Sequence, residues 1–125
     1  MITLGTGRGT GRGTERKVIG MADQTRLQQI QKMLDDEPHD AMLRYMLAME
    51  YVSQANDVEA ARCFHDLLAA TPDYVPAYMQ AGQTLVRLGK SDEARTIFER
   101  GIAAAQQKQD FHARDEMQGM LAELE

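Results

Sequence analysis

The chain has 125 residues, enough for one small domain, and strong helix formers dominate its composition, which favours an all-α fold. Its net charge is −5, whereas residues 1–20 carry about +3, so the acidic remainder disfavours nucleic acid and anionic membranes as partners. A single cysteine rules out an intrachain disulfide, and the lack of a membrane-length apolar stretch or a secretory signal predicts a cytoplasmic protein.

Residues 1–22 form a Gly/Thr/Arg-rich segment that contains "GTGRGTGRGT". Its glycines all fall at odd positions, so no two are five apart as G-x-G-x-x-G requires, and Lys17 is followed by Val18 rather than the Ser or Thr of a phosphate-binding loop. This composition cannot bury apolar surface, so we expect a disordered tail. Two alternatives stay open: a nucleic-acid arm built on its regularly spaced arginines, and a native start at Met21 that leaves residues 1–20 out of the protein.

The first three predicted helices are separated by clear breakers. Asp23 caps a helix that Pro38 ends, and a second helix covers about residues 39–54. After the turn "QAND", Asp57 is expected to cap a helix over 58–70, which Thr71-Pro72-Asp73 breaks. The first helix carries its apolar residues at helical spacing: Leu27, Ile30, Met33 and Leu34.

Three further helices follow. Pro76 lies in the first turn of a helix over 75–88, and Gly89 suits the left-handed position after its end. Ser91 is expected to cap a helix that runs to about Gln107. A last helix over 110–124 has one apolar stripe, formed by Phe111, Met117, Met120, Leu121 and Leu124.

Two stretches of this sequence repeat at an offset of 34 residues. Small residues align with small residues, which lets paired helices approach closely, and a phenylalanine fills the space beside them in each copy. The aligned pairs include Ala48 with Gly82, Tyr51 with Leu85, Ala60 with Ala94, Phe64 with Phe98 and Leu68 with Ile102.

At these positions the chain resembles the tetratricopeptide repeat (TPR) family, whose pattern of Leu, Gly, Tyr, Ala, Phe and Pro recurs every 34 residues. The resemblance implies an α-solenoid of antiparallel helix pairs, a right-handed superhelix of about six helices. Residues 23–125 then form one TPR-like domain. It comprises a half repeat at 23–38, full repeats at 41–74 and 75–108, and a capping helix at 110–124.

The resemblance also implies where a partner binds, because ligands of the family lie in the concave groove lined by the first helix of each repeat. Chaperone-binding members of the family hold the C-terminal carboxylates of a peptide with Lys and Asn side chains on these helices. Such a clamp is not expected here, because only Arg87 is basic among the corresponding positions. The alternative is that neighbouring helices cover some of the expected groove residues. The expected groove residues are Met42, Tyr45, Met49, Val52, Met79, Gln83, Val86 and Arg87.

The sequence offers little for catalysis. His39, His65 and His112 share no common spacing, and Cys63 beside Phe64 on a helix is expected to be a packed small hydrophobe. We therefore expect no enzyme activity, no metal and no cofactor. The favoured function is an adaptor that binds a protein or peptide partner in the groove, and the alternative is self-association into a homodimer.

Overall fold

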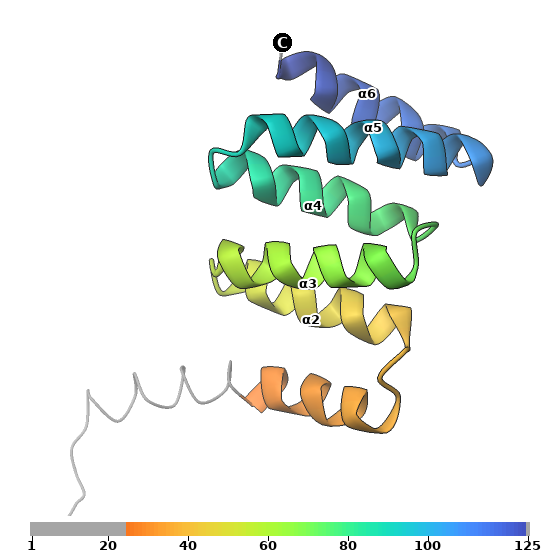
Figure 1. The fold of residues 1–125 in the computed structure, drawn as a ribbon. Helices are drawn as coiled ribbons and strands as arrows, with labels where there is room; N and C mark the ends of the chain where they lie inside the picture. The colour runs from red at the N-terminus through yellow and green to blue at the C-terminus, as the bar shows by residue number, and fades with distance from the viewer. Residues whose placement is uncertain (1–24, 125) are drawn as a thin grey trace, which may run out of the picture.

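The computed structural model describes residues 25–124, which form six helices stacked in chain order (Figure 1). This confirms the all-α, six-helix expectation, whereas the predicted tail over 1–22 and the cap at Asp23 lie outside the described residues. The helices are residues 25–36, α2 (Ala41–Ser53), α3 (Asp57–Ala70), α4 (Val75–Arg87), α5 (Ser91–Gln107) and α6 (Phe111–Glu123).

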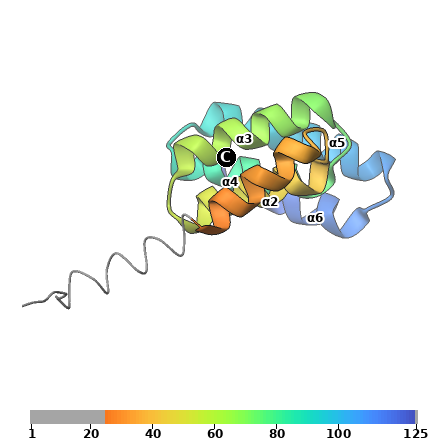
Figure 2. The same cartoon turned by 90° about the horizontal axis from the view of Figure 1, so that it is seen from below.

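The helices form two sides of one array. Each helix from α2 to α6 packs against the next one in the chain, and α4 also contacts α6. Seen along the stack, α3 and α5 lie on one side and α2 and α6 on the other (Figure 2). We call the first the α3/α5 side. Because α4 contacts α6, we call the second the α2/α4/α6 side; it contains the helices that the repeat pattern expects to line the groove.

Buried small residues recur along the array. Ala48, Ala60 and Ala94 are completely buried, and the Phe64 and Phe98 rings are buried as well. These side chains belong to one continuous apolar core. The structure thus buries the small and aromatic residues that align at the 34-residue offset.

Two glycines show how tight this packing is. A Cβ atom on Gly82 would overlap the Phe98 ring. A Cβ atom on Gly101 would lie 2.5 Å from Tyr78 Cβ and 2.6 Å from Met117 Sδ. Any larger residue at either position would push two helices apart.

Three helices end in the same geometry. Ala55, Gly89 and Gln109 follow α2, α4 and α5 with φ of 58°, 78° and 60°, in the left-handed region. The amide of the next residue donates to a carbonyl five positions earlier, at 2.9, 2.8 and 2.8 Å respectively. This is the Schellman termination, so the expectation for Gly89 is confirmed.

Two predicted caps are wrong. Asn56, not Asp57, caps α3 by accepting a hydrogen bond from the Glu59 amide, and Asp57 is already the first helical residue. Ser91 likewise lies inside α5, and Lys90 holds the cap position without a side-chain hydrogen bond. In both cases the helix starts directly after the left-handed turn, one residue earlier than the sequence pattern indicated.

The stripe predicted for α6 is only partly buried. Met117 is fully buried, but Phe111 is 45% exposed, with the Arg114 guanidinium 4.8 Å above its ring. The sequence pattern placed Phe111 on the packed face of this helix. It is the first residue of α6, which begins four positions after α5 ends at Gln107.

Candidate functional site: the α2/α4/α6 side

The four α2 residues expected in the groove differ in accessibility. Met42 is 62% exposed and projects from the helix. Tyr45, Met49 and Val52 are partly buried and pack against the core. The α2 part of the expected groove is therefore a partly covered apolar strip with one freely accessible methionine.

Tyr45 shows why this strip is held in place. Its ring lies 5.5 Å from the Tyr74 ring and 6.2 Å from the Phe64 ring, both in tilted orientations. Burial, with a smaller contribution from Tyr74, raises the pKa of Tyr45. Tyr45 thus links α2 to α3 and to the start of α4, and it remains a neutral phenol at physiological pH.

A cavity of about 440 Å³ opens between α4 and α6. Three of the expected groove residues, Gln83, Val86 and Arg87, line it from α4, and the Phe98 ring forms part of its wall. Val86 is 40% exposed, so its methyl groups are available to a ligand. The α6 side of the cavity, which the expected groove did not include, is formed by Met120, Glu123 and Leu124.

Met120 had a signal in the sequence. Continuing the 34-residue offset by one period from Val52 and Val86 leads to Met120, which places it on the same side of the array. The Gln83 amide nitrogen lies 3.7 Å from its sulfur atom. Met79, the remaining expected residue, is partly buried against the core.

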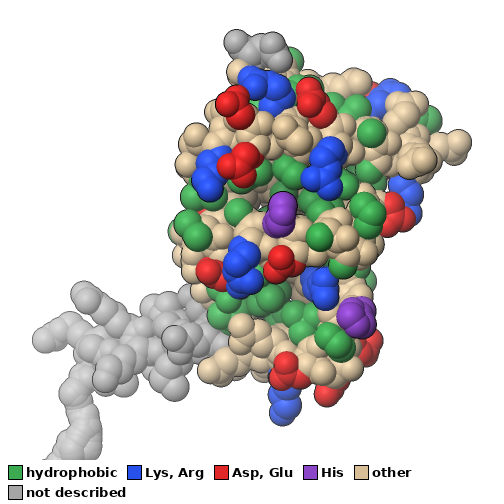
Figure 3. All heavy atoms as spheres, viewed as in Figure 1, with side chains coloured by type: hydrophobic (Ala, Val, Ile, Leu, Met, Phe, Trp, Pro, Cys, Tyr) green, Lys and Arg blue, Asp and Glu red, His purple; other side chains and the backbone are tan. Residues whose placement is uncertain are grey.

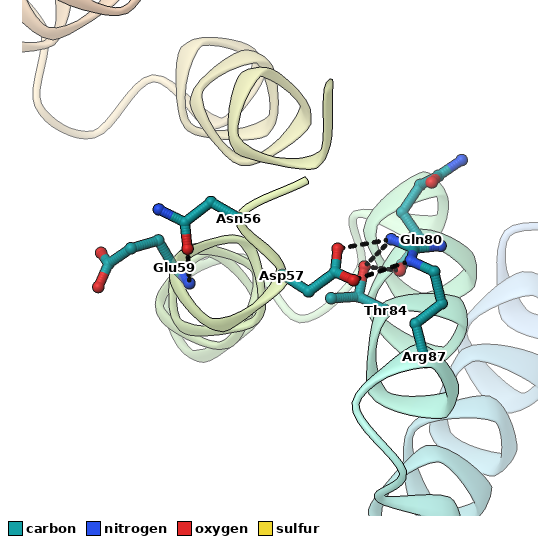
Figure 4. Close-up of polar contacts among 6 residues, drawn as sticks. All are labelled: Asn56, Asp57, Glu59, Gln80, Thr84 and Arg87. Atoms are coloured by element: carbon teal, nitrogen blue, oxygen red, sulfur yellow. Dashed lines mark hydrogen bonds and ion pairs between the residues drawn. The ribbon is translucent and has the colours of Figure 1, made fainter. Parts of the chain in front are cut away.

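Arg87 is oriented by a polar network that joins the two repeats (Figure 4). Its guanidinium donates two hydrogen bonds of 3.1 Å to the Asp57 carboxylate at the start of α3. It also donates to the Thr84 hydroxyl at 3.1 Å, and that buried hydroxyl donates to the Gln80 carbonyl at 2.8 Å. Arg87 is therefore held in one orientation beside the cavity, and Asp57 compensates much of its charge.

Other reactive groups are placed as the sequence indicated. His39, His65 and His112 are all exposed, and Cys63 is buried. Burial is the main cause that raises the Cys63 pKa, so its thiol is a poor nucleophile at neutral pH. Within residues 25–124, no group of three or more His, Cys, Asp or Glu side chains could hold a metal ion.

None of the helices in the described part of the chain is both long and apolar enough to cross a bilayer.

Paired antiparallel helices, a 34-residue offset and small residues at each crossing define a helical repeat protein. A tetratricopeptide repeat family model matches residues 58–122, more than half of the sequence. The chain therefore belongs to the tetratricopeptide repeat family, whose domains generally serve protein–protein interactions. No curated protein matches the chain.

Solved structures give the same assignment. A tetratricopeptide repeat domain protein from Salinibacter ruber, in its solution structure, is 31% identical over 70% of this chain and 89% of its own, with a TM-score of 0.67. A Bordetella parapertussis protein is 28% identical over 78% of this chain and 85% of its own, with a TM-score of 0.69. PcrH, crystallised with the chaperone binding region of PopD, shares the fold at 15% identity, with a TM-score of 0.76 over 95% and 96% of the two chains.

Proposed function

We propose that this protein is a non-enzymatic adaptor that binds a peptide segment of a protein partner on its α2/α4/α6 side. The observation that carries the proposal is the cavity between α4 and α6, where apolar and polar side chains converge at an accessible surface. Binding sites of this kind combine a mostly apolar lining with a few fixed polar groups.

The side chains here suit a peptide with apolar anchors. Met42 and Val86 are exposed, and Met120 offers a flexible, polarizable thioether that can adapt to different partners. Arg87, fixed by Asp57, adds a directed hydrogen-bond donor. PcrH, which has the same fold, is seen in complex with a segment of another protein, and this supports the proposed type of ligand.

Site-specific photo-crosslinking in the native cell tests the proposal. A photoreactive residue placed at Val86 or Met42 is expected to capture a peptide segment of another protein. The matched control is the same residue at Ala69, which is exposed on α3 and lines none of the cavities described here. Identical adducts at Ala69 would contradict the proposal, and adducts between two copies of this chain would favour the homodimer.

A binding measurement then checks the captured partner. The Val86→Glu, Met42→Glu double variant alters two exposed side chains, so it is expected to stay folded. It should bind the partner at least about tenfold more weakly, as truncation of interface anchors commonly does. Circular dichroism verifies the fold, and unchanged affinity in a folded double variant would count against this surface.

A further inference from the structure

The α3/α5 side carries a second and larger cavity, of about 520 Å³, that the proposed function does not use. Figure 3 looks onto this side, where apolar side chains lie in a hollow between rows of charged ones. Four of the residues at its apolar base come from three different helices: Leu68 from α3, Ala81 and Leu85 from α4, and Ile97 from α5.

The rim of this cavity is predominantly basic, although the chain as a whole is acidic. Arg62, Lys90 and Arg100 line it together with one carboxylate, Glu93. The Arg62 charge is compensated, because Glu59 lies 2.6 Å from its guanidinium and a second carboxylate lies 3.5 Å away.

Lys90 and Arg100 are different. Within residues 25–124, neither forms an ion pair with a carboxylate, and Arg100 lies 5.7 Å from the Tyr78 ring centroid. Two cations that form no ion pair among these residues thus stand along the α5 edge of an apolar hollow, with Glu93 as the one carboxylate in its lining.

We infer that the α3/α5 cavity is a second docking site, for an acidic peptide segment whose carboxylates bracket apolar anchors. The apolar anchors would enter the hollow, and the carboxylates would pair with Lys90 and Arg100. Lys90 holds the cap position of α5 and Arg100 lies ten positions further along it, so the two are roughly 15 Å apart along the helix axis at 1.5 Å per residue. Matching carboxylates lie about five residues apart in an extended segment, or about ten in a helical one.

Two fluorescent peptides test this site on the full chain, both with leucine anchors between two glutamates placed either five or ten residues apart. At least one is expected to bind, more weakly at high salt, and replacing its glutamates by lysines should reduce affinity about tenfold or more. If neither acidic peptide binds, or if the lysine versions bind equally well, the proposal is wrong.

Matched variants locate the binding. Lys90→Glu with Arg100→Glu should weaken binding about tenfold or more, whereas Lys32→Glu with Lys108→Glu changes the net charge equally, away from the cavity, and should have little effect. Thr96→Phe fills the cavity without changing charge and should also weaken binding. Equal affinity of the first pair, the control pair and the native chain would overturn the proposal.

Methyl NMR distinguishes this site from the one proposed above. No methionine is among the residues that line the α3/α5 cavity, whereas Met120 lines the α4/α6 cavity. The peptide should shift the Ala61 and Ile97 methyl signals and leave Met120 unchanged. A shift confined to Met120 would overturn the second site while supporting the first.

Discussion

Gly101 and Gly119 both lie within helices, but they have opposite surroundings. A Cβ atom on Gly101 would press on Tyr78 Cβ at 2.5 Å and on the buried Met117 sulfur. Nothing lies within 4 Å of the corresponding position on Gly119. The same substitution should therefore have opposite effects at the two positions.

We expect Gly101→Ala to lower the free energy of unfolding by about 1–3 kcal/mol, the usual cost of overpacking. Gly119→Ala is the matched control and should raise it by roughly 0.5–1 kcal/mol, because alanine is the better helix former. Urea unfolding followed by circular dichroism measures both. Equal effects of the two substitutions would show that α5 and α6 are less tightly packed than the structure indicates.

The start of α3 gives a second contrast between two single residues. Asn56→Ala removes the side chain that caps the helix and should cost about 1 kcal/mol of stability. Ser91→Ala changes the residue that the sequence pattern indicated as a cap but that makes no capping hydrogen bond, and should change stability by less than about 0.5 kcal/mol. Thermal unfolding of the two variants measures the difference, and a larger loss for Ser91→Ala would reverse the cap assignment.

At the scale of elements, the link between Asp57 and Arg87 joins the start of α3 to the end of α4. The two side chains are 21% and 44% exposed, so solvent weakens their attraction without removing it. Double-mutant cycles of such pairs give modest coupling, and we expect about 0.5–1 kcal/mol for Asp57→Ala with Arg87→Ala.

The Asp92–Arg95 pair is the control for this cycle, because both residues lie on α5 and the Asp92 carboxylate is almost fully exposed. Its coupling should be no more than about 0.5 kcal/mol. Urea unfolding measures the coupling free energy of both pairs. If the two are equal, the Asp57–Arg87 pair between α3 and α4 stabilises the protein no more than an ion pair within one helix does.

The elements also show what sequence reasoning can reach. Caps, breakers and apolar spacing predicted the helices, and the 34-residue offset predicted their close crossings, because a repeat imposes the same small residues on each copy. It could not separate Asn56 from Asp57 as a cap, since both residue types cap well and they are adjacent. It also missed the α6 wall of the cavity, because α6 was assigned to capping and its stripe was expected to be buried.

Side-chain partners far apart in the sequence were a second limit. Arg87 appeared in the sequence as a groove residue, yet its orientation depends on a carboxylate 30 positions earlier. A periodic pattern does not specify which of several charged side chains will form an ion pair in the fold. Likewise, the sequence places both Met42 and Val52 in the expected groove, but only Val52 packs against the core.

Over the whole molecule, each helix relies mainly on its neighbours in the stack. Stability in such arrays is a sum of local terms, so the middle helices are held from two directions and the outer ones chiefly from one. We expect amide hydrogen exchange to be slowest in α3, α4 and α5 and faster in residues 25–36 and α6. Uniform protection across residues 25–124 would instead indicate that the array opens only as one unit.

Methionines are distributed unequally between the two sides of the array. Met42, Met49, Met79 and Met120 belong to α2, α4 and α6, whereas the α3/α5 cavity is lined without any. Oxidation to the sulfoxide turns an apolar thioether into a polar group. An oxidant would therefore change the chemistry of the α2/α4/α6 side, the first proposed binding side, and leave the lining of the α3/α5 cavity intact.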